Sequence, residues 1–194
     1  MKKITFVKQL TFFIALFCAV NFGFGQIVAW EMQGQFGDQI NMNSTTTAPE
    51  LNTSVLRRGP GILPIVVVDS FSSGGFNVPG TQAAAIASGD YLEFQVSTSP
   101  GYKVSLSTLN ANFLRNNFGP KRFIWRYSLD GSTFVDIGSA FLYDDNNANG
   151  TAQPQINLNI IPGLQDVVYG KTITFRLYGW DTGGGSAFFG IGKL

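Results

Sequence analysis

The chain of 194 residues has no histidine, and its single cysteine, Cys18, lies near the amino terminus. Nucleophilic catalysis commonly depends on a Ser-His or Cys-His pair, and neither pair can form without histidine. The G-x-S-x-G nucleophile motif is absent as well. The glutamates Glu31, Glu50 and Glu93 lie on separate predicted segments, without the paired acids of a glycosidase. We therefore expect a protein that is not an enzyme.

Charged residues are also scarce. They make up 13% of the chain, and no run of basic residues is longer than two. Binding to nucleic acid or to an anionic membrane surface needs clustered lysine and arginine side chains that neutralise phosphates. The sequence therefore excludes nucleic acid and anionic membranes from the expected partners.

The amino-terminal segment has the pattern of a secretory signal peptide. Basic residues at positions 2 and 3 precede an apolar stretch (10–20), and cleavage is expected between Gly25 and Gln26. The apolar stretch is too short for a stable membrane span. A lipoprotein is the minor alternative, because Phe17 is too bulky for the residue that precedes a lipidated cysteine. We expect residues 1–25 to be removed with Cys18, leaving residues 26–194 as one secreted domain without a disulfide.

Short apolar-alternating runs, separated by Gly, Asn, Ser and Thr, dominate the rest of the chain. Ten of them predict strands, at 27–32, 53–57, 65–68, 91–96, 102–115, 123–129, 133–138, 155–160, 172–180 and 186–192. This pattern predicts an all-β fold, a two-sheet antiparallel β-sandwich of the jelly-roll type. One short connecting helix is expected in TQAAAIASG, with Thr81 as its N-cap and Gly89 as its stop.

The segment FIWRYSLDGSTFVDIG (123–138) predicts a central hairpin that turns at Asp130-Gly131. Side chains alternate along a strand, so Phe123, Trp125, Tyr127 and Leu129 share one face, which the aromatic rings identify as the core face. The opposite face carries Ile124, Arg126 and Ser128.

Three segments carry a family resemblance: YKVSLSTLNANF, GPKRFIWRYSLDGSTFVDIG and TITFRLYGW. They resemble the jelly-roll modules of secreted surface proteins of the Bacteroidota and, more distantly, the galactose-binding-like sandwiches of discoidin and carbohydrate-binding modules. The resemblance implies a sandwich whose first and last strands pair, here IVAWEM (27–32) beside SAFFGIG (186–192). Such modules usually accompany fibronectin-like repeats and a sorting domain, neither of which is found in this sequence.

Asp145, Asn147, Asn149 and Gly150 have the D-x-N-x-N-G spacing of a calcium loop. Ile156 stands at the twelfth position, where such loops place a bidentate glutamate. Asp and Asn also favour turns that hold no ion. A structural calcium and an ion-free turn are therefore both open, and the turn is favoured.

The outward faces of three predicted strands form the candidate ligand-binding surface. Tyr91 and Glu93 face away from the core on one strand, Arg126 on the hairpin, and Arg176, Tyr178 and Trp180 on the strand at 172–180. Flat aromatic rings beside planar donors and carboxylates suit a sugar ring and its hydroxyls. Cross-strand ion pairs and aromatic packing under a loop are the structural alternative.

The expected function is a secreted, non-catalytic binding module that recognises carbohydrate at the cell surface or outside the cell. The alternative is a structural or adhesive surface component whose partner is another protein. Clustered exposed rings would favour a glycan, whereas a broad apolar patch or a bare strand edge would favour a protein.

The alternation of side chains along the strands also predicts opposite surroundings for two tryptophans, the core for Trp125 and solvent for Trp180. We expect Trp125→Ala, in the core, to cost about 3–5 kcal/mol. Trp180→Ala should leave the fold largely intact if its ring faces solvent. Thermal unfolding of both variants tests this, and a comparable loss in both would contradict an outward-facing Trp180.

Overall fold

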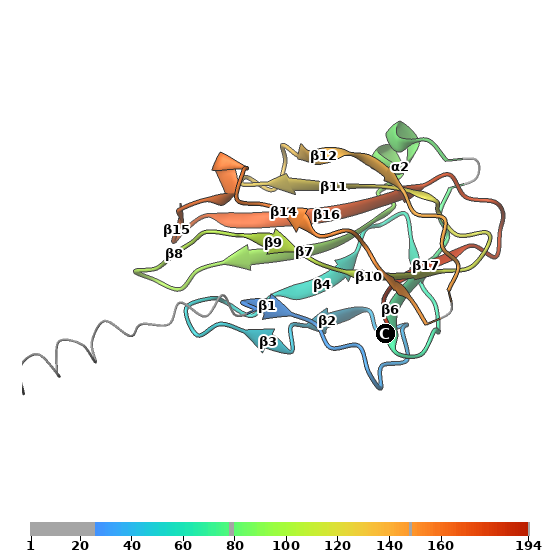
Figure 1. Ribbon diagram of the computed structural model, residues 1–194, viewed down its shortest axis with the longest axis horizontal. Coiled ribbons are helices and arrows are strands. Elements are labelled where there is room, and N and C mark those ends of the chain that lie inside the picture. Colours follow the sequence, from blue (N-terminus) through green and yellow to red (C-terminus); the bar gives the residue numbers. More distant parts are fainter. Residues whose placement is uncertain (1–25, 78–79, 148, 194) are drawn as a thin grey trace, which may run out of the picture.

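The computed structural model describes residues 26–77, 80–147 and 149–193. The predicted signal peptide lies outside these residues. The described part contains 17 short strands, most of them in two main sheets, together with one α-helix and one turn of 3-10 helix. The two-sheet antiparallel sandwich is therefore confirmed (Figure 1). Among the described residues, no helix is long and apolar enough to span a membrane.

The six-stranded sheet has the order β12-β11-β16-β7-β4-β2. Figure 1 shows these strands from β12 at the top to β2 near the bottom. Their bounds are β12 Val135–Leu142, β11 Arg122–Ser128, β16 Thr172–Trp180, β7 Tyr91–Ser97, β4 Val55–Arg58 and β2 Asn41–Asn43. The longest strand, β16, lies at the centre and pairs with β11 on one side and β7 on the other.

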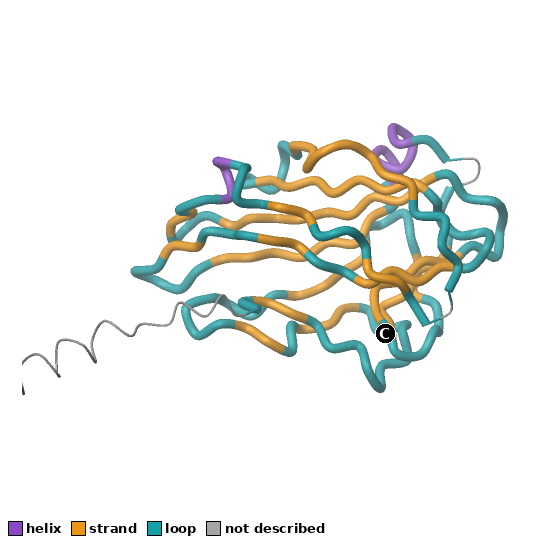
Figure 2. The backbone as a smooth tube through the Cα atoms, in the orientation of Figure 1, coloured by secondary structure: helices purple, strands orange, loops and turns teal. Residues whose placement is uncertain are grey.

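The five-stranded sheet has the order β13-β10-β17-β6-β5. Its strands are β13 Thr151–Ala152, β10 Asn112–Arg115, β17 Phe188–Gly192, β6 Ser70–Gly74 and β5 Leu63–Pro64. Two short pairs continue the β10 and β13 segments beyond the sheet (Figure 2). They are β9 Thr108–Leu109 with β14 Ile156–Asn157, and β8 Lys103–Val104 with β15 Val167–Val168. A third pair, β1 Val28–Ala29 with β3 Thr46–Thr47, is separate from both main sheets. The 3-10 turn is Pro162–Leu164.

Several boundaries differ from the sequence-based prediction. The strand expected at 102–115 is divided into β8, β9 and β10. Such divisions help to explain why the described residues form 17 strands and not the ten expected. The strand expected at 65–68 is wrong, because that segment leaves the sheet after β5. The expected pairing of the first and last strands is also wrong. β1 pairs with β3, while β17 lies between β10 and β6.

The short helix is confirmed as α2, Gln82–Ser88. Thr81 caps its start by accepting a hydrogen bond from the Ala84 backbone N–H at 3.2 Å. Gly89 ends it in the left-handed conformation, with φ of 81°, which glycine adopts without a steric penalty. The helix packs on the outer face of the six-stranded sheet, against β16.

Aromatic rings from both sheets fill the space between them. Phe94 stacks on Phe175 at 4.9 Å between ring centroids, and Phe113 meets Phe189 edge to face at 5.0 Å. Trp125 is 2% exposed, and its indole N–H donates to the Gln153 amide oxygen at 3.0 Å. Each fully buried large apolar side chain contributes roughly 1.5–3 kcal/mol, so these rings are a main source of stabilisation.

The hairpin of β11 and β12 is confirmed, but its turn is longer than the two residues that the sequence predicted. β11 ends at Ser128 and β12 begins at Val135, so Leu129 falls in the loop and is 37% exposed rather than buried. Asp130 organises this loop. Its carboxylate accepts from the backbone N–H groups of Thr133 at 2.7 Å and Ser132 at 2.8 Å, and from the Ser128 hydroxyl at 2.8 Å.

These hydrogen bonds, above all those from the Thr133 and Ser132 backbone, hold the pKa of Asp130 far below its usual range. The stabilisation is present above the unfolded-state pKa of aspartate, about 3.9, and is lost as the pH falls towards the folded-state pKa. We expect Asp130→Asn to lose less thermal stability than the wild type between pH 7 and pH 3. Ser132→Ala keeps the backbone donor and is the matched control. Equal losses in the wild type and Asp130→Asn would contradict the role of this carboxylate.

Candidate functional site

The outer face of the six-stranded sheet brings the predicted polar residues into one row. The strand registers place Asp136, Arg126, Arg176, Glu93 and Arg57 side by side on five neighbouring strands. We call these five residues the charged row. Arg126 and Arg176 are adjacent in the row. Each has a carboxylate on its other side, Asp136 beside Arg126 and Glu93 beside Arg176.

Two short ion pairs hold the row. The Arg126 Nε donates to Asp136 Oδ1 at 2.6 Å, and the Arg176 Nε donates to Glu93 Oε2 at 2.7 Å. The second pair is the more enclosed, with side chains 21% and 14% exposed. Burial disfavours the charged guanidinium, but hydrogen bonds to Tyr178 and Glu93 outweigh it and raise the pKa of Arg176. Arg176 is therefore a permanently charged, fixed part of the sheet surface.

Aromatic rings restrain Arg176 further. Its guanidinium carbon lies 4.1 Å from the centre of the Tyr91 ring and 4.0 Å from that of Phe134. Such cation–π contacts contribute about 0.5–1 kcal/mol at exposed sites and more where water is excluded. Tyr91 and Phe134 are half-buried, and both use their rings to hold the arginine. Tyr91, which the sequence analysis placed on the ligand-binding surface, therefore has the Arg176 guanidinium over its ring.

Tyr178 and Trp180 do point away from the main core, but the expectation that they reach solvent is wrong. They are only 2% and 7% exposed. Together with Ile124 and Ala85 they form a second apolar cluster beneath helix α2. The sequence predicted both the helix and the outward direction of the two rings, but not that the helix would cover the rings.

The Asp145 loop is held by its own hydrogen bonds. Asp145 accepts from the Asn147 backbone N–H at 2.9 Å and from the Thr151 hydroxyl at 2.6 Å, and Asn147 accepts from the Asn149 backbone N–H at 3.0 Å. The bond from Thr151, followed by that from Asn147, lowers the pKa of Asp145. Turn chemistry thus explains the Asp and Asn spacing. Across the described ranges, no three acidic, cysteine or histidine side chains cluster closely enough to hold a metal. Calcium binding stays a prediction.

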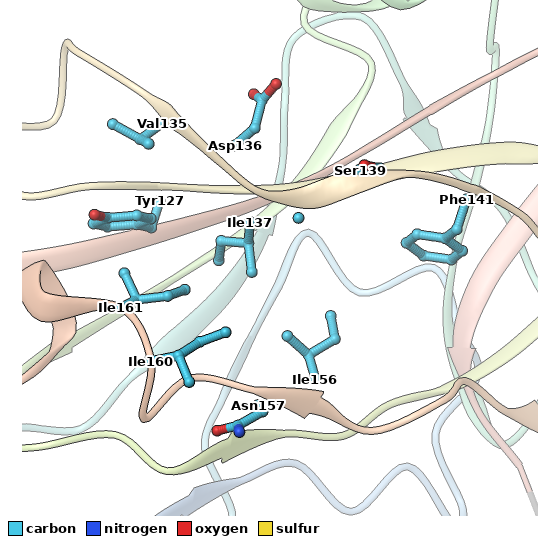
Figure 3. A pocket seen from close by; sticks show the side chains of 11 residues that line it. Tyr127, Val135, Asp136, Ile137, Ser139, Phe141, Ile156, Asn157, Ile160 and Ile161 are labelled. Carbon is cyan, nitrogen blue, oxygen red and sulfur yellow. The ribbon is translucent and has the colours of Figure 1, made fainter.

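An apolar groove of about 420 Å³ lies along the edge of the sandwich. It runs between β12, the outermost strand of the six-stranded sheet, and residues 156–161 of the other layer (Figure 3). We call it the β12 groove. In Figure 3, Tyr127 and Ile137 face Ile156, Ile160 and Ile161 across the opening. The sequence analysis missed it, because its walls belong to segments far apart in the chain.

The groove opens onto the main core. Ile137 is 6% exposed and belongs to that core, whereas Val135 and Ile160 on the rim are 51% and 77% exposed. Asp136, which pairs with Arg126, is the one charged residue among the described residues of the lining, and Figure 3 shows its carboxylate pointing away from Ile156 and Ile161. The lining is thus mostly apolar, with Asp136, Ser139 and Asn157 among its polar residues.

A bulge interrupts β12 at the groove. Phe123 pairs with Phe141 and Trp125 with Ile137, so residues 138–140 of β12 oppose Ile124 alone. Gly138 adopts a φ of 70° there. Bulges twist an edge strand and hinder its pairing with another strand. Contact at this edge is therefore better made by side chains that enter the groove than by a continued sheet.

Comparison with known proteins provides no assignment: no family model, no curated protein and no solved structure matches the chain.

The burial of Trp180 changes the expected effect of its removal. Trp180→Ala should cost about 3–5 kcal/mol, as for Trp125→Ala, because it empties the cluster under α2. Arg122→Ala is the control. Arg122 is the strand partner of Trp180 and its side chain is half-exposed, so its removal should change stability little. Urea unfolding measures both variants. If Trp180→Ala unfolded at the same urea concentration as the wild type, this packing would be contradicted.

Proposed function

We propose that this protein is a non-catalytic module of the cell exterior that contacts other proteins through the β12 groove. The observation that carries the proposal is the groove itself, an apolar opening beside the outermost strand β12. Exposed apolar patches on soluble proteins commonly mark protein–protein contacts. Tyr127, Ile137 and Ile156 offer the kind of apolar socket in which a partner's side chain contributes most of its binding energy.

The charged row supports a second candidate, carbohydrate recognition on the outer face. Arg57 and Gln95 are exposed beside the partly buried Glu93 and would present planar donors and acceptors to sugar hydroxyls. The burial of Tyr178 and Trp180 weighs against it, since it removes two of the three predicted aromatic rings from that face. We therefore rank protein contact first.

A random peptide library displayed on phage tests the first proposal, with the chain 26–194 immobilised. We expect selected peptides to be rich in apolar residues. Their binding should fall by about tenfold or more with Ile160→Asp, because an apolar side chain would then have to desolvate a carboxylate. Val66→Asp, a similar change at an exposed site on the far edge of the sandwich, is the matched control and should bind like the wild type.

A glycan array probed with the same proteins decides between the candidates. Glycan binding that is lost with Arg57→Ala and kept with Ile160→Asp would favour the carbohydrate function and reject the groove as the main site. Failure to enrich any peptide, or enrichment indifferent to Ile160→Asp, would overturn the proposal of protein contact.

A further inference from the structure

Phe118 is an exposed ring among the loops at one end of the sandwich. It is 51% exposed and lies in the loop 116–121, between β10 and β11. The Gly183 N–H donates to the Phe118 carbonyl at 2.8 Å, which brings the loop 181–187, red at the right of Figure 1, against it. A β-carbon at Gly183 or Gly184 would lie 3.6 Å or 3.8 Å from the ring Cδ1. Because both residues are glycine, neither places a side chain over the ring.

A polar network adjoins this ring. Asp144 Oδ1 pairs with the Arg115 Nη1 at 3.3 Å and with the Lys121 Nζ at 3.2 Å. The Arg115 Nη2 donates to the Asn117 carbonyl at 3.2 Å, and the Asn146 side-chain amide donates to Asn117 Oδ1. We call these five residues the Asp144 network. It joins the loop that carries the exposed ring to the loop that follows β12.

Buried and backbone contacts hold these loops in place. Arg115 is 2% exposed, and its Nη2 also donates to the Gly119 carbonyl at 2.8 Å. The Asn116 side-chain amide donates to the Ser186 carbonyl at 2.7 Å, and Asn116 Oδ1 accepts from the Phe188 N–H at 3.2 Å. All three loops are therefore joined by hydrogen bonds without a ligand. A site that is already ordered loses little conformational entropy when it binds.

Three exposed members of the network retain hydrogen-bonding groups. Asn117 and Asn146 are exposed, and the Asp144 side chain is 55% exposed. Both cations contact Oδ1 of Asp144, and the two asparagines use one atom each for their mutual bond. Within the described part of the chain, this leaves Asp144 Oδ2 and Asn146 Oδ1 as acceptors and Asn117 Nδ2 as a donor. The site can therefore both donate to a ligand and accept from it.

The charges around the network balance. Three basic and three acidic side chains lie in it or next to it: Arg115, Lys121, Arg122, Asp144, Asp145 and Asp181. Arg122 pairs with Asp181 at 3.5 Å, as Lys121 does with Asp144. An excess of one sign of charge attracts an ion of the opposite sign, and these residues provide no such excess. They are better suited to a neutral ligand.

We infer that Phe118 and the Asp144 network bind a neutral carbohydrate. A sugar ring has an apolar face, which stacks on an exposed aromatic ring, here Phe118. Each sugar hydroxyl both donates and accepts, so it matches the mixed groups of Asn117, Asn146 and Asp144. Binding residues on loops that a rigid sandwich positions are a common arrangement.

This site is separate from the other two surfaces. None of its residues lines the β12 groove or belongs to the charged row. The inference therefore goes beyond the proposed protein contact and does not depend on it. It also differs from the second candidate function, because the sugar would bind at the loops and not on the outer face of the six-stranded sheet.

An array of neutral and acidic glycans probed with the chain 26–194 tests the inference. We expect binding to neutral glycans, weakened about tenfold or more by Phe118→Ala, because this change removes the stacking surface. Asn117→Ala should also weaken binding while leaving the ring in place. Both positions are exposed, so neither change removes a core side chain. Phe36→Ala, at a ring that is 69% exposed in another loop, is the matched control and should bind like the wild type.

Amide NMR spectra of the protein with the best-bound neutral glycan then locate the contact. The side-chain amide signals of Asn117 and Asn146 should shift on titration, whereas the indole signal of Trp125, whose N–H is bonded in the core, should not.

Four results would overturn the inference. They are an array on which no neutral glycan binds, binding restricted to acidic glycans, binding kept in both Phe118→Ala and Asn117→Ala, and binding lost only with Arg57→Ala. The last would assign the sugar to the charged row. Peptide binding that is sensitive to Ile160→Asp reports on the β12 groove alone, so either proposal can fail while the other survives.

Discussion

The alternation of side chains along β16 is the constraint on which the rest of the structure depends. Because β16 is hydrogen-bonded on both sides, its register with β11 and β7 determines which residues face inward and which face outward. Ile173, Phe175 and Leu177 build the core between the sheets, while Arg176, on the other face, joins the charged row. A shift of one residue would exchange the two faces and place Arg176 among the core rings.

Within the described residues, the sandwich is stabilised by packed rings and a few buried polar anchors. Trp125 and Gln153 connect the two layers through one hydrogen bond. Arg115, 2% exposed, donates to the carbonyls of Asn117 and Gly119 and pairs with Asp144 at 3.3 Å. An arginine buried in this way contributes through loop positioning as much as through charge, since its donors satisfy carbonyls that water would otherwise bind.

The two faces and two edges of the sandwich serve different purposes. On the outer face of the six-stranded sheet, four of the five charges of the charged row are paired and Tyr178 and Trp180 are buried under α2, while Arg57 stays exposed. The edges keep apolar side chains in solvent, at Val135 and Ile160 on one side and at Leu63 and Val66 on the other. Since exposed apolar surface costs free energy in water, covering these side chains with a partner would be favourable.

Local sequence determined the elements whose causes are local. The cap at Thr81, the stop at Gly89 and the inward rings of β11 each follow from a few neighbouring residues, and all three were predicted. The length of the Asp130 turn was missed although its cause is also local, because an Asp-Gly pair equally fits a two-residue turn. The burial of Trp180 and the two walls of the β12 groove join segments distant in the chain, as does the strand order around β17. Such contacts depend on which segments become neighbours after folding, so only the tertiary structure decided them.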